Sequence, residues 1–144
     1  MTKVVLDTPI LVSAFLRPGP GGASIELLKL AMRGRFALFL SDGILEETAR
    51  VLLRLGRMRD RYAYAGEQVF EYCQDLGKLA DVIEVPPTVR VVRDPNDDMI
   101  IACALAAQAD YLVSRDKDLL VLGGHGGVAI VAPESFLRMF DEEI

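Results

Sequence analysis

Two aspartates stand at places in the sequence where an apolar segment ends. Asp7 interrupts the run "VVLDTPILVSAFL", and Asp116 follows "YLVS". Burying a carboxylate costs several kcal/mol unless the charge is paired or bound to a metal, so an acid beside a core-forming segment needs a partner. Taken singly, Asp7 could cap the following helix, Asp116 could occupy a turn and Asp118 could cap a short helix. Their joint placement is what points to a shared site.

The segment "GILEETARVLLRL" carries two adjacent glutamates that helical geometry separates. At about 100° per residue, its apolar side chains fall on one stripe. Glu46 then points nearly opposite to that stripe, whereas Glu47 lies about 90° from its centre. We therefore expect Glu46 in solvent and Glu47 beside the core, where it can lean into a cleft.

The segment "DPNDDMIIACALA" opens a helix that is apolar on every side. Asp94 suits the N-cap, Pro95 the first helical position, and Asp97 the positive end of the helix dipole. These structural roles leave Asp98 unexplained. Because the whole helix is apolar, its periodicity does not tell which way Asp98 faces.

Short β-branched segments alternate with helical patterns along the chain, which predicts a three-layer α/β/α fold with a mostly parallel central sheet. Thr8 is the expected N-cap of a helix that starts at Pro9. In such sheets the ligand site lies beyond the carboxyl ends of the strands, where Asp7 and Asp116 fall. Strands are expected at 3–7, 36–41, 81–86, 89–92, 110–114 and around 128–131, and helices at 9–16, 23–34, 43–55, 64–80, 94–109 and after 132.

Length and composition predict a single domain over residues 1–144. The net charge of −5 argues against a protein that coats nucleic acid through its overall field. Cys73 and Cys103 sit in apolar helical patterns, as expected of reduced thiols in a cytoplasmic protein. No apolar run reaches the ~18 residues of a membrane span, so no membrane association is expected.

Taken in order, four blocks of the sequence resemble the PIN-domain nucleases, especially those regarded as toxins of toxin–antitoxin pairs. The blocks are "VVLDTPILVSAFL", "SDGILEETARVLLRL", "DPNDDMIIACALAAQADYLVSRDKDLLVL" and "IVAPESFL". The resemblance implies that the metal-binding, catalytic acids are Asp7, Glu47, Asp98 and Asp116. Asp98 is preferred to Asp97 because the family's acid precedes a pattern that "MIIACA" fits. Supporting roles go to Ser114, two positions before the last acid, and to Thr8 and Asp97.

The same resemblance implies that the protein is a ribonuclease that uses Mg²⁺ or Mn²⁺. Clustered carboxylates repel one another, and a divalent cation with oxygen ligands removes that penalty and can activate water. Such chemistry needs no histidine, and His125 lies in the glycine loop "GGHGG" as an expected bystander. The expected partners are an RNA substrate, an antitoxin protein and a second copy in a homodimer.

The arginines of "RVLLRLGRMRDRY" could bind an RNA backbone beside the Glu47 helix, with Arg50, Arg54 and Arg57 foremost. They could equally be a solvated helix end.

Other functions stay open to different degrees. A phosphatase of the haloacid-dehalogenase type is disfavoured because it would need a second aspartate where Pro9 stands. A nucleotide-binding module is also disfavoured, because "GPGGAS" lacks the lysine of a phosphate loop. Pro9 also replaces an asparagine that is usual in the PIN family. That departure keeps a degenerate, purely binding PIN-like domain as the alternative.

Overall fold

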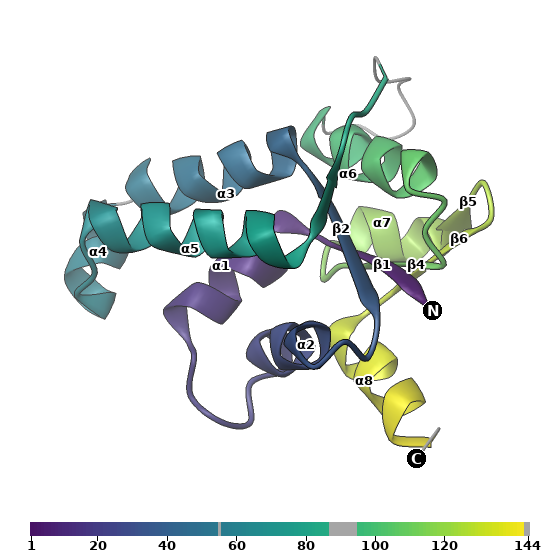
Figure 1. Ribbon diagram of the computed structural model, residues 1–144, viewed down its shortest axis with the longest axis horizontal. Helices are drawn as coiled ribbons and strands as arrows, with labels where there is room; N and C mark the ends of the chain where they lie inside the picture. Colours follow the sequence, from purple (N-terminus) through teal and green to yellow (C-terminus); the bar gives the residue numbers. More distant parts are fainter. Residues whose placement is uncertain (55, 87–94, 143–144) are drawn as a thin grey trace.

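The structure is a computed structural model that describes residues 1–54, 56–86 and 95–142 (Figure 1). Its strands are β1 (Lys3–Leu6), β2 (Ala37–Ser41), β3 (Asp81–Ile83), β4 (Tyr111–Val113), β5 (Gly124–His125) and β6 (Val128–Val131). Its helices are α1 (Thr8–Leu16), α2 (Ala23–Met32), α3 (Asp42–Arg54), α4 (Gly56–Tyr62), α5 (Gly66–Leu79), α6 (Pro95–Ala106), α7 (Lys117–Leu122) and α8 (Pro133–Glu142). In the part of the chain described, no helix is long and apolar enough to cross a membrane.

The strands form one sheet in the order β3-β2-β1-β4-β6-β5, which confirms the predicted, mostly parallel sheet. Only β5 runs antiparallel, against β6, among the strands described. The central strands β1 and β4 pair with Leu6 opposite Val113. Asp7 and Ser114 follow these two residues, so they leave the sheet side by side at its carboxyl edge.

Helices cover both faces of the sheet, as the three-layer prediction required. Tyr111 of β4 meets Phe136 of α8, with 5.4 Å between the ring centroids. The next residue, Leu112, lines a small cavity with Ile101 and Ala104 of α6. Because successive side chains of a strand point to opposite faces, α6 and α8 lie on opposite sides of the sheet, as Figure 1 also shows.

The hydrophobic core fixes the position of the site through β1 and α1. Val4, Val5 and Leu6 are fully buried, as expected of a central parallel strand covered on both faces. A second buried cluster joins α1, α3 and α5, and in it the Tyr64 hydroxyl donates to the carbonyl of Leu52 at 2.6 Å. These contacts pack α1 against the second half of α3 and so fix the relative position of the two helices.

Some local predictions were wrong, for identifiable reasons. Asp7, not Thr8, is the N-cap of α1, and its carboxylate accepts from the Thr8 N–H, so Pro9 is the second helical residue. Asp116, not Asp118, caps α7. Helix α4 was not expected, because its arginine-rich sequence has no apolar period. The strand predicted at 89–92 and the cap predicted at Asp94 lie outside the described residues.

Candidate metal centre

Asp7 is held at the carboxyl edge of the sheet by two hydrogen bonds, one from the start of α1 and one from the residue that follows β4. Its Oδ1 accepts from the Thr8 N–H at 2.8 Å, and its Oδ2 accepts from the Ser114 hydroxyl at 2.6 Å. Ser114 is fully buried, and its Oγ also accepts from the Asp116 N–H at 3.0 Å. The Ser114 hydroxyl thus connects the acid that follows β1 to the acid that follows β4.

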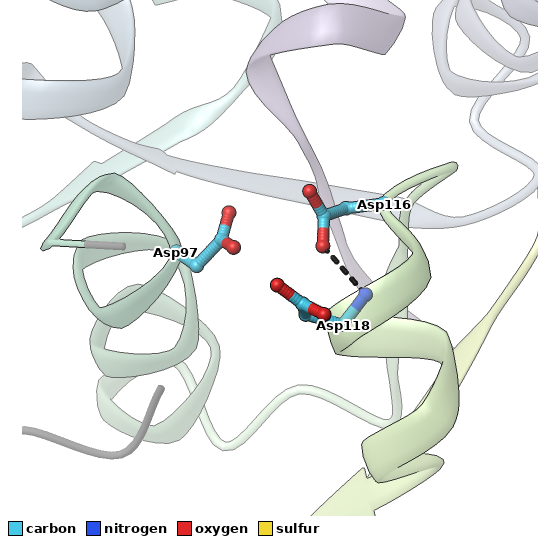
Figure 2. Close-up of side chains that lie close together, drawn as sticks. All are labelled: Asp97, Asp116 and Asp118. Atoms are coloured by element: carbon cyan, nitrogen blue, oxygen red, sulfur yellow. Dashed lines mark hydrogen bonds between the residues drawn. The ribbon is translucent and has the colours of Figure 1, made fainter. Parts of the chain in front are cut away.

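Three aspartates come together between α6 and the start of α7, and we call Asp97, Asp116 and Asp118 the three-aspartate group (Figure 2). One carboxylate oxygen of each lies within 4.8 Å of the others. Asp97 is buried, Asp116 is half-buried and Asp118 is exposed, so the group runs from the protein interior to the surface. Asp116 is fixed in place because its Oδ1 accepts from the N–H groups of Asp118 at 2.9 Å and Leu119 at 3.2 Å.

The donor set of the three-aspartate group fits a hard divalent cation. All its ligand atoms are carboxylate oxygens, which Mg²⁺ and Mn²⁺ prefer. Oxygens on opposite sides of an octahedral Mg²⁺ are about 4.2 Å apart, and the three carboxylate oxygens all lie within 4.8 Å of one another, near enough to share one cation. A cation would also relieve the repulsion between these negative charges.

The two glutamates of α3 differ in burial as the helix geometry predicted. Glu46 is exposed, whereas the side chain of Glu47 is only 17% exposed and forms an ion pair with Arg50 one turn later. The beginning of α3 approaches α6 closely, because a Cβ at Gly43 would lie 2.7 Å from the Met99 sulfur. This contact brings the helix of Glu47 against the helix of Asp97 and Asp98.

The remaining predicted site residues differ in their burial and in their distance from the three-aspartate group. Asp98 is 4% exposed and is not in the three-aspartate group, whereas Asp97, expected in a supporting role, lies beside Asp116 in that group. Thr8 is buried, and its Oγ1 has no hydrogen-bond partner among the described residues. Arg50 and Arg54 are exposed, whereas the side chain of Arg57 lies outside the described part.

Asp118 was not among the predicted ligands. Its signal in the sequence was weak: two aspartates spaced i and i+2 at a helix start, in "RDKDLL", which equally suits a capping turn.

The sequence matches a known protein family. Residues 3–118 match the sequence profile of the PIN domain, a span that begins at β1 and ends at Asp118. The chain belongs to the PIN domain family. Members of this family are generally nucleases and usually use divalent metal ions. The matched span of the PIN domain contains every acid of the site described above.

Solved structures share the fold. A chain of the crystal structure of VapBC2 from Rickettsia felis, bound to a DNA fragment from their promoter, is similar with a TM-score of 0.61 and 17% identity. The likeness covers 90% of this PIN domain chain and 97% of that chain, and at this identity it shows the fold alone. No curated protein sequence matches this chain.

Proposed function

We propose that this PIN domain is a Mg²⁺- or Mn²⁺-dependent endoribonuclease and the toxin of a toxin–antitoxin pair. The observation that carries the proposal is the three-aspartate group, close to Asp7 at the carboxyl edge of the sheet. The nuclease activity usual in the family supports it. The likeness to a chain of VapBC2, a toxin–antitoxin complex, supports an antitoxin as partner. A homodimer and a cytoplasmic location belong to the same proposal.

The proposed acidic site consists of Asp7, Glu47 and the three-aspartate group, with Asp98 as the rival of Asp97 for the ligand position. A bound divalent metal lowers the pKa of water and stabilises the leaving oxygen of a phosphodiester. Ser114 orients the Asp7 carboxylate through its 2.6 Å hydrogen bond. The α7 cap keeps Asp116 beside Asp97, so the chain presents its acids already arranged.

Metal binding should stabilise this PIN domain. At a metal concentration about 100 times Kd, the free energy of unfolding should rise by about 2.7 kcal/mol, which corresponds to several degrees in Tm. The measurement compares Tm in EDTA and in millimolar Mn²⁺, together with cleavage of a single-stranded RNA in both solutions. Glu46→Gln removes one surface charge outside the acidic site and should keep the full shift. An unchanged Tm without cleavage would leave the domain as a degenerate binding module.

Arginines on α3 and α4 should contribute to RNA affinity through phosphate contacts. Arg54 and Arg61 are exposed and lie beyond the Arg50–Glu47 pair, so their replacement leaves that pair intact. For each of Arg54→Ala and Arg61→Ala, the slope of log K against log salt should fall by roughly 0.7 if one phosphate contact is lost. Arg33→Ala, after α2, is the matched control. If all three variants keep the natural slope, the α3–α4 arginines do not bind RNA.

A further inference from the structure

A cavity of about 380 Å³ lies between α1, α3 and α4, and no role has been assigned to it above. Its walls are mostly apolar, with Pro9, Val12 and Leu16 on one side and Val51 on the other. The volume falls within the roughly 300–1,000 Å³ typical of small-ligand sites. The cavity is therefore large enough to take a compact group rather than only water.

The cavity begins beside the acids of the proposed site. Thr8 lines it and directly follows Asp7. Val51 lines it from α3, one helical turn after Glu47 on the same face of that helix. If a phosphate of an RNA chain lies at Asp7 and Glu47, the neighbouring nucleotide can therefore reach the cavity.

The cavity lining also contains an aromatic ring, Tyr62, and a positive charge, Arg17. Tyr62 lines the cavity from α4, and the Arg61 guanidinium carbon lies 5.6 Å from its ring centroid. The Arg17 guanidinium lies beside the Tyr62 hydroxyl and lowers the pKa of that phenol. Proteins that bind single-stranded nucleic acids commonly use aromatic rings to stack on the bases and arginines to contact the phosphates.

We propose that this cavity binds a nucleobase of single-stranded RNA adjacent to the phosphodiester at the acidic site. The inference rests on the proposed function, since it places the scissile phosphate at Asp7 and Glu47. A base has flat apolar faces that fit the mostly apolar walls of the cavity. Arg17 in the lining and Arg61 beside Tyr62 complement the backbone phosphates of RNA, which favours RNA over an uncharged peptide segment.

The test is whether the domain distinguishes RNA from a chain that has no bases. The probes are a fluorescent single-stranded RNA of about 12 nucleotides and an abasic ribose-phosphate chain of the same length. Binding is measured by anisotropy in EDTA, so that no cleavage interferes. The natural domain should bind the RNA about tenfold more tightly than the abasic chain, a difference of ~1.4 kcal/mol. Equal affinities would overturn the proposal.

Filling the cavity should remove this preference. Ser13 lines the cavity on α1 and is half-buried, so Ser13→Trp would occupy the space without touching an acid. The variant should bind the RNA and the abasic chain with equal affinity, namely the affinity of the natural domain for the abasic chain. Met32→Trp adds the same indole at a residue of α2 that is 69% exposed and should keep the tenfold preference. Should Ser13→Trp lower Tm strongly, Tyr62→Ala replaces it and should also reduce the preference.

The outcomes separate this inference from the proposed function. Base preference without cleavage in Mn²⁺ would refute the nuclease and keep the cavity as a base site. Cleavage in Mn²⁺ by a domain that binds both chains equally would keep the nuclease and refute the base site. A Ser13→Trp domain that retains the tenfold preference would also refute it and leave the cavity to a protein partner.

Discussion

Glu47→Gln is expected to lower the rate of metal-dependent RNA cleavage by about a hundredfold or more, on the order of 3 kcal/mol in the barrier. Glu47 is mostly buried, at 17% side-chain exposure, on the face of α3 that runs toward Val51 and the cavity. Glutamine keeps the shape of the side chain but removes the charge that would bind a cation. Single-turnover cleavage of a labelled RNA in Mn²⁺ measures the effect.

The adjacent glutamate is the matched control for this experiment. Glu46 is exposed, so Glu46→Gln should change the rate by no more than about twofold, ~0.4 kcal/mol. The ion pair that Glu47 forms with Arg50 is partly exposed, and such pairs contribute roughly 0–1 kcal/mol, so Tm should change little. Equal losses of activity in the two variants would contradict the assignment of Glu47 to the acidic site.

Asp97→Asn is expected to abolish most of the Tm rise in Mn²⁺ and to lower cleavage by about a hundredfold or more. Asp97 belongs to the three-aspartate group, whereas its neighbour Asp98 lies outside it. Successive residues of a helix point about 100° apart, so the two carboxylates do not face α7 alike. Asp98→Asn should therefore keep most of the Mn²⁺-induced shift.

The quantity to compare between these variants is the shift between EDTA and Mn²⁺, not Tm itself. Asp98 is 4% exposed, so changing it also alters the free energy of unfolding of the metal-free domain. If instead Asp98→Asn loses the shift and Asp97→Asn keeps it, Asp98 is the ligand, as the resemblance to the family's sequence pattern implied.

The sequence by itself determined the class of fold and the edge of the sheet at which acids gather. Valine-rich strands alternating with helices require a covered parallel sheet, and Asp7 and Asp116 stand just past two of its strands. The different burial of Glu46 and Glu47 was also predictable, because α3 has a single apolar stripe that fixes its orientation.

Tertiary structure decided which acids meet. Helix α6 is apolar on every side, so its sequence carries no orientation, and only its packing against β1, β2 and α3 turns Asp97 toward Asp116. The hydrogen bond from Ser114 to Asp7 joins residues 107 positions apart and follows from the register of β1 against β4. The cavity beside Thr8 likewise arises only where three helices leave a space between them. Local periodicity reports the burial of one element, whereas a contact between two elements depends on how both of them pack.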